Sequence, residues 1–153
     1  MSRHIVIDRL NTVLSWELAG IVQYLHYSAL VTGHLRPVYS DFFTDGSKEA
    51  RSHAQLVADK IVSLGGVPTA EPAAILPAAD LDTMLANTLS LEENALAAWE
   101  KAWEVGEHAN LGTKLWMEEM IAEEQGHVDE VRKLLRTPSA AVSAPGNGQV
   151  QTA

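Results

Sequence analysis

Cysteine is absent from the 153-residue chain. This absence excludes disulfides, cysteine-based zinc or rubredoxin-type sites, and a cysteine nucleophile, so aspartate, glutamate and histidine remain to carry metal or acid–base chemistry. Apolar runs are also short, because none approaches the roughly 20 residues that span a bilayer. The N-terminal residues contain no apolar secretory segment. We therefore expect a cytoplasmic protein with no membrane partner.

Basic residues are scarce: 11 lysines and arginines stand against 20 acidic residues, giving a net charge of -9. The densest basic group is Arg132, Lys133 and Arg136, near the C-terminus. An acidic chain without a basic patch repels the phosphate backbone of nucleic acids and attracts cations. Metal ions, not nucleic acids, are the partners that this charge pattern predicts.

Strand patterns are nearly absent, whereas apolar residues recur with the 3.6-residue period of helices through most of the chain. Glycine- and proline-rich breaks divide this pattern into four pieces. The predicted helices cover residues 4–33, 37–64, 80–107 and 111–136. Pro37 suits the first turn of the second helix, Gly65 the position after its end, and Asp80 the cap of the third. Residues 137–153 have no core-forming pattern, so we predict a bundle over 1–136 and a flexible C-terminal tail over 137–153.

The connection over residues 65–79 is the long one. A 28-residue helix measures about 42 Å, and 15 extended residues reach roughly 50 Å. The connection can therefore run the whole length of the bundle and return the third helix parallel to the second. The two short connections make each flanking pair antiparallel. The fold predicted is an all-α antiparallel four-helix bundle of ferritin-like type with one long crossover.

Each predicted helix carries a glutamate or histidine, residues that can bind metal, on its inward apolar stripe. They are Glu17, His53 and Glu92 on the first three helices, and Glu124 with His127 on the fourth. A charged carboxylate buried alone costs several kcal/mol, and three buried together repel one another. Divalent cations between them would remove both costs, and two imidazoles complete such a ligand set. The joint pattern predicts a two-metal site.

Several motifs resemble those of bacterioferritins over about residues 5–136. They are Glu17 with Gln23-Tyr24, Arg51-Ser52-His53-Ala54, Leu64-Gly65-Gly66-Val67-Pro68, Glu92, and Glu124-Gln125-Gly126-His127. The resemblance implies two irons per subunit, with manganese or zinc as alternative metals.

The resemblance also implies roles for the site residues. Glu17 and His53 would hold one iron, Glu92 and His127 the other, and Glu124 would bridge them. Tyr24 would serve as a hydrogen-bonding or redox-active phenol beside the site. The implied activity is oxidation of Fe(II) by dioxygen or peroxide for iron storage or detoxification, in a homo-oligomer that in some members forms a cage.

Two positions depart from the family. The second bridging glutamate normally stands three residues before the histidine of the second helix, and here that position is Ala50. Glu49, one residue earlier, flanks the same face and is the substitute ligand that we predict. Bacterioferritins that bind haem use a methionine where this chain has Arg51, so haem is not expected.

Two other functions stay open at this point. One is a diiron or dimanganese oxidase or peroxidase that acts on another substrate; the other is a scaffold whose site has decayed through Ala50. Glu93 and Glu123 are alternative ligands if the helical register differs by one residue. The four tryptophans fit core or interface packing better than electron transfer: Trp16, Trp99, Trp103 and Trp116.

Overall fold

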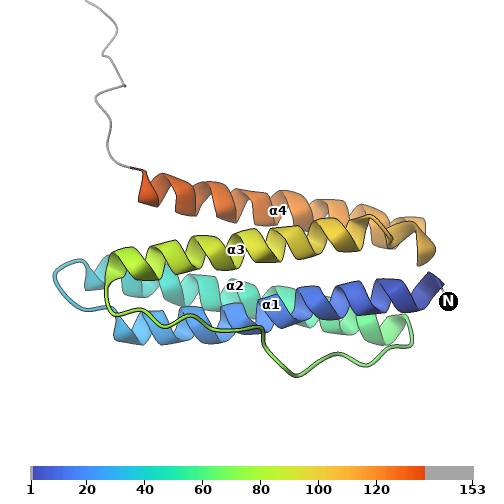
Figure 1. Ribbon diagram of the computed structural model, residues 1–153, viewed down its shortest axis with the longest axis horizontal. Coiled ribbons are helices and arrows are strands. Elements are labelled where there is room, and N and C mark those ends of the chain that lie inside the picture. Colours follow the sequence, from blue (N-terminus) through green and yellow to red (C-terminus); the bar gives the residue numbers. More distant parts are fainter. Residues whose placement is uncertain (1, 137–153) are drawn as a thin grey trace, which may run out of the picture.

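The computed structural model describes residues 2–136, which form four long helices and one short 3-10 turn (Figure 1). The bounds are α1 Ser2–Leu30, α2 Arg36–Ser63, α3 Leu81–Trp103, η1 Gly106–His108 and α4 Leu111–Leu135. Within these residues there is no strand, and no helix is long and apolar enough to cross a membrane. The predicted helices are confirmed to within a few residues at each end. The predicted tail lies outside the described residues.

The helix ends follow from local chemistry. Pro37 lies in the first turn of α2. The Asp80 side chain accepts a hydrogen bond from the Thr83 backbone N–H at 2.8 Å and so caps α3. Gly65 follows α2 with φ +85, a left-handed conformation that side chains disfavour. All three assignments were predicted. The third helix ends at Trp103, four residues before its predicted end, because the chain turns through η1 before α4.

The crossover runs back along α1, so that α3 points in the same direction as α2 (Figure 1). It is hydrogen-bonded to α1 at three points along that helix. Thr69 N donates to Asn11 Oδ1 at 2.8 Å, Ala73 N to the Ser15 carbonyl at 2.8 Å, and Leu76 N to Gln23 Oε1 at 3.0 Å. These bonds satisfy backbone groups of a segment without secondary structure. The predicted crossover is confirmed, and its path fixes how α3 lies against α1.

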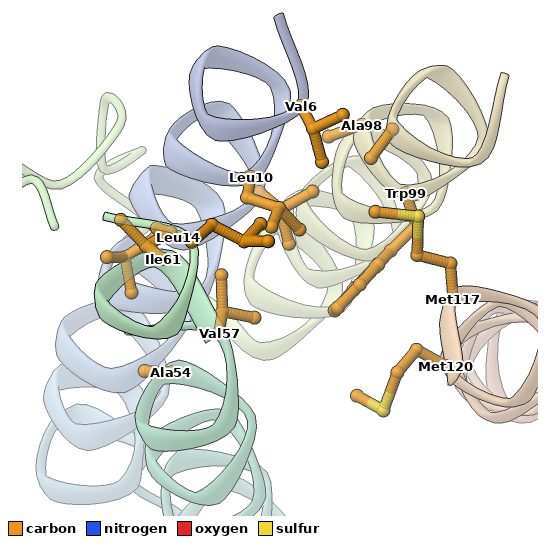
Figure 2. Close-up of a cluster of buried hydrophobic side chains, with 13 residues drawn as sticks. Val6, Leu10, Leu14, Ala54, Val57, Ile61, Ala98, Trp99, Met117 and Met120 are labelled. Carbon is orange, nitrogen blue, oxygen red and sulfur yellow. The ribbon is translucent and has the colours of Figure 1, made fainter. Parts of the chain in front are cut away.

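Two apolar clusters fill the bundle, one toward each end. The cluster shown in Figure 2 includes Leu10, Val57 and Trp99, with Met117 and Met120 of α4 packed beside the indole. The other cluster gathers around three aromatic side chains and their aliphatic neighbours: Tyr24, Tyr27, Phe43, Ala19, Val31, Met84, Leu85 and Leu91. Along every helix the predicted ligand residues lie at or beyond the inner edges of these clusters. The folding of the apolar residues therefore positions the polar ones near mid-bundle.

Two large apolar residues near the helix ends are exposed. Trp103, the last residue of α3, is 37% exposed, and Leu134, near the end of α4, is 41% exposed. At the ends of the bundle a helix has fewer neighbours to cover its inner face. Trp103 is held there by a 2.9 Å hydrogen bond from its Nε1 to Glu118 and by Lys114 over its ring.

Candidate metal centre

Five predicted site residues meet between the two apolar clusters. Glu17, His53, Glu92 and Glu124 are buried, and His127 is half-buried. Their ligand atoms form two groups, Glu17 with His53 and Glu124, and Glu92 with Glu124 and His127. Within each group the atoms lie within 4.8 Å of one another. Glu124 belongs to both groups, so one carboxylate joins two adjacent sets of donors.

Both imidazoles turn Nδ1 toward the inner carboxylates. His53 Nδ1 is 3.5 Å from Glu17 Oε1 and 3.9 Å from Glu124 Oε2. His127 Nδ1 is 3.8 Å from Glu92 Oε2 and 3.7 Å from Glu124 Oε2. The two rings stack with 5.8 Å between centroids. The arrangement gives each group one inward-facing nitrogen, and the Nδ1 lone pair is available whenever the proton sits on Nε2.

The outer nitrogens meet a second pair of carboxylates in a crossed arrangement. Glu49 of α2 lies 2.8 Å from Nε2 of His127 on α4, and Glu123 of α4 lies 3.4 Å from Nε2 of His53 on α2. Metal-binding histidines usually donate their other ring N–H to a carboxylate, which fixes the tautomer and the ring orientation. Glu49 and Glu123 are placed to do this for the two imidazoles.

Glu49 was predicted as a flanking ligand, and the structure places it in a different group from the inner carboxylates. It is exposed, and its ligand atom clusters with those of Glu123 and His127. Glu123, the alternative for a shifted register, lies in the same outer group. Glu93, the other alternative, instead faces Arg132 at 3.6 Å with nearly half of its side chain exposed. An acid four residues before each histidine is the sequence signal that marks both outer partners.

Ala50 is buried and lines the cavity of the site, at the position where the family has a carboxylate. It packs so closely on α1 that a Cβ added to Gly20 would lie 3.1 Å from the Ala50 Cβ. A cavity of about 230 Å³ opens beside Ala50, and all five inner site residues line it. The departure from the family pattern therefore leaves space next to the candidate ligands.

Two further buried side chains contact the inner carboxylates. The Tyr24 hydroxyl donates a hydrogen bond to Glu92 Oε1, and Trp99 Nε1 donates one to Glu17 Oε1 at 3.4 Å. Burial and the neighbouring Glu92 carboxylate raise the pKa of Tyr24 well above its usual value, so the phenol keeps its proton at neutral pH. Gly46 makes room for this ring, because a Cβ at that position would lie 2.5 Å from it.

When no cation is bound, protons on the carboxylates and imidazoles reduce the repulsion among the buried acidic groups. Burial raises the pKa of Glu17 and of Glu124. Burial opposes a low pKa for Glu92 as well, but hydrogen bonds with Glu124, His127 and Tyr24 outweigh it and lower that pKa. Burial likewise opposes protonation of His53 and His127, yet the adjoining carboxylates raise the pKa of both. Divalent cations can replace these protons, since metal binding requires deprotonated ligands and releases protons. The residues present fit a dinuclear metal group.

Comparison with known proteins decides the family. Residues 7–140 match the family described as Ferritin, the ferritin-like domain. The chain belongs to this family. It is also 29% identical over 128 residues to the bacterioferritin of Brucella melitensis biotype 1, covering 81% of this chain and 78% of that protein. The resemblance seen in the motifs is therefore confirmed over most of the bundle.

Solved structures of ferritin-like proteins share the same architecture. A ferritin-like, diiron-carboxylate protein of Bacillus anthracis superposes with a TM-score of 0.85 at 32% identity, over 89% of this chain and 99% of that chain. The dodecameric thioferritin of Bacteroides fragilis, a bacterioferritin-related protein, gives 0.78 at 26%, over 87% and 85%. The bacterioferritin of Rhodobacter capsulatus, with a metal-free dinuclear site and haem iron, gives 0.78 at 26%, over 85% and 82%. The ferritin-like four-helix fold predicted for this member is confirmed.

Proposed function

We propose that this ferritin-like protein binds two divalent metal ions, iron in the cell, and oxidises Fe(II) for storage or detoxification. Glu17 and His53 hold one ion, Glu92 and His127 hold the other, and Glu124 is shared. The observation that carries the proposal is the position of Glu124, whose carboxylate belongs to both groups of donor atoms. Relatives of known structure include a diiron-carboxylate protein, which supports iron as the metal.

The remaining residues prepare the site for Fe(II). Loading displaces the protons that the buried carboxylates and imidazoles hold in the metal-free protein. Glu49 and Glu123 keep each imidazole with Nδ1 turned inward. Tyr24 donates to Glu92 and so limits which of its oxygens is free to bind metal. When bound, a pair of Fe(II) ions supplies electrons for the reduction of dioxygen or peroxide.

The test is a titration of metal-free protein with Fe(II) without oxygen, followed by exposure to dioxygen in an oxygen electrode. We expect about two Fe(II) per chain and oxygen consumption that stops when the added Fe(II) is oxidised. The matched control is Glu119→Ala, which removes an exposed carboxylate of α4 and should change neither result. Oxygen consumption no faster than that of Fe(II) in buffer would refute the oxidase activity. Metal content after growth with iron and manganese would show which metal is selected.

One observation favours a second candidate, an oxidase or peroxidase that acts on another substrate. The cavity beside the site is lined not only by ligands but also by Phe42, Val131 and the Tyr24 ring, and it could admit a small organic molecule. Under this alternative the same metal ligands are used. Turnover of a peroxide or an organic substrate without net Fe(II) consumption would favour it over iron oxidation.

We further propose that the protein assembles into a homo-oligomer. Large apolar side chains of α1 and α2 are exposed, among them Leu25 at 60%, Val38 at 66% and Val62 at 59%. Exposed apolar surface of this kind often marks an interface. Trp16 and Trp116, two of the tryptophans predicted to pack in the core or at an interface, are half-buried against the core. A dodecameric relative supports assembly, though not a particular subunit number.

Sedimentation velocity at micromolar concentration checks this proposal. We expect a species several times the 16.6 kDa of one chain. Leu25→Lys should shift the distribution toward smaller species, because it places a charge on an exposed apolar position of α1. His26→Lys, at an exposed but polar neighbouring position, is the matched control. A single 16.6 kDa species would contradict assembly and remove iron storage, because a mineral needs an enclosure.

A further inference from the structure

The site contains three inner carboxylates, one fewer than the ligand pattern of ferritin-like dinuclear bundles has. In ferritin-like dinuclear bundles, two helices each give one glutamate and two others each give Glu-x-x-His. Here α4 carries Glu124 three residues before His127, whereas α2 carries Ala50 three residues before His53. Residues three apart share a helix face. The vacant carboxylate position therefore lies at Ala50, on the wall of the cavity that the other ligands line.

The charges of the metal ions and the inner ligands indicate that an anion suits the position at Ala50. Two divalent cations bring four positive charges, and Glu17, Glu92 and Glu124 supply three negative ones. The two ions would therefore carry one positive charge more than the carboxylates placed to bind them directly, and the other acids that line the cavity, Asp45, Glu49 and Glu130, lie outside the two inner donor groups. Glu49 does not supply the missing ligand in this arrangement, because its carboxylate lies 2.8 Å from the outer nitrogen of His127, across the ring from Nδ1.

The space beside Ala50 suits a small organic anion. Among the described residues, no Cα atom of α2 comes within 8 Å of one of α4, so the cavity lies in the wide seam between these helices. The volume of about 230 Å³ covers the whole cavity, including the space between the inner ligands that two metal ions would fill. Beside that space lie Ala50, Phe42, Val131 and the Tyr24 ring, which give this part of the cavity apolar walls. A small carboxylate would direct its oxygens toward the metal-binding residues and its hydrogen or methyl group toward these walls.

We propose that the cavity beside Ala50 binds a small monocarboxylate, the size of formate or acetate, as the fourth carboxylate of the metal site. This inference rests on the proposed function and names a co-ligand for the same site. The anion binds only after the metal ions. Without them, the three inner carboxylates and the further acids that line the cavity, Asp45, Glu49 and Glu130, would repel an anion. Binding of metal and of anion must then strengthen each other by the same factor.

The experiment titrates metal-free protein with Co(II), a redox-stable substitute for Fe(II), in a non-coordinating buffer containing sodium acetate or sodium chloride at equal ionic strength. We expect acetate to tighten binding of the second Co(II) at least tenfold and to shift the visible spectrum of bound Co(II). Acetate should leave the thermal unfolding of the metal-free protein unchanged. In the protein loaded with Zn(II), ¹³C-labelled acetate should show a bound NMR resonance.

Two variants of Ala50 make the test specific. Ala50→Glu supplies the missing carboxylate, so it should bind the second Co(II) tightly without acetate and no longer respond to it. Ala50→Gln fills the same space without the charge, so it should lose the acetate response and gain no affinity. Circular dichroism of both variants establishes that the bundle is intact.

The contrary results are distinct from a failure of the proposed function. If two Co(II) bind but acetate acts no more strongly than chloride, the site is dinuclear and the anion inference is wrong. The inference is also wrong if Ala50→Glu keeps the full acetate response. If no Co(II) binds in either salt, the dinuclear site itself is refuted.

Discussion

Glu124→Ala is expected to weaken binding of both metal ions by about 10²–10⁴-fold. Removing one partner from a buried charged set costs about 3–5 kcal/mol, and each 1.36 kcal/mol corresponds to a factor of ten. Glu124 is shared by both donor groups and is 1% exposed, so water cannot easily replace it. Loss of this carboxylate would remove the negative charge between the two cations and so increase their mutual repulsion. Stopped-flow Fe(II) oxidation should slow in parallel with the loss of affinity.

Glu49→Ala is the informative comparison. Its carboxylate is exposed and contacts the outer nitrogen of His127. Outer partners of this kind typically change metal affinity or activity by 10–100-fold, so the loss should be smaller than for Glu124→Ala. Glu123→Ala should resemble Glu49→Ala, because it stands in the same relation to His53.

The titration that checks these expectations is metal binding to each variant, with Glu119→Ala as the exposed-carboxylate control. If Glu49→Ala is as damaging as Glu124→Ala, Glu49 binds metal directly and α2 is rotated in the loaded protein. If neither substitution changes affinity or oxidation rate, the dinuclear proposal fails.

Trp99→Ala is expected to destabilise the metal-free bundle by about 3–5 kcal/mol, the usual cost of truncating a buried aromatic side chain to alanine. Trp99 is fully buried, stands edge-to-face with Trp116 at 5.3 Å between centroids, and packs near Met117 and Met120 (Figure 2). Trp103→Ala is the matched control on the same helix. Because Trp103 is 37% exposed at the helix end, its loss should cost less than half as much.

Urea unfolding in the presence of a chelator measures both changes at one protein concentration. Trp99→Phe separates packing from the hydrogen bond, because phenylalanine retains most of the apolar contact but cannot donate to Glu17. We expect it to recover part of the lost stability while still altering metal binding. Equal destabilisation by Trp99→Ala and Trp103→Ala would contradict the two-cluster description of the core.

Local sequence patterns were sufficient to predict the helices and their order. Glycine, proline and Asp80 mark the ends of elements because backbone conformation and capping depend on neighbouring residues alone. The direction of α3 followed from the reach of the crossover. The five inner site residues were also predictable, since each stands on an apolar stripe where burying an unpartnered charge would be costly. The exposure of Trp103 and Leu134 was not predictable, because an apolar stripe does not show where the bundle stops covering a helix.

What the sequence by itself determined, then, is which face of each helix turns inward and which polar residues lie on it. Only the tertiary structure decided how those residues pair. Glu49 and Glu123 each contact the histidine of the opposite helix, and Tyr24 and Trp99 reach carboxylates 68 and 82 residues away. The cavity beside Ala50 likewise depends on the separation of α2 and α4. Helical periodicity sets direction around one axis, whereas contacts between helices depend on their relative rotation and spacing, which are fixed only when the whole core packs.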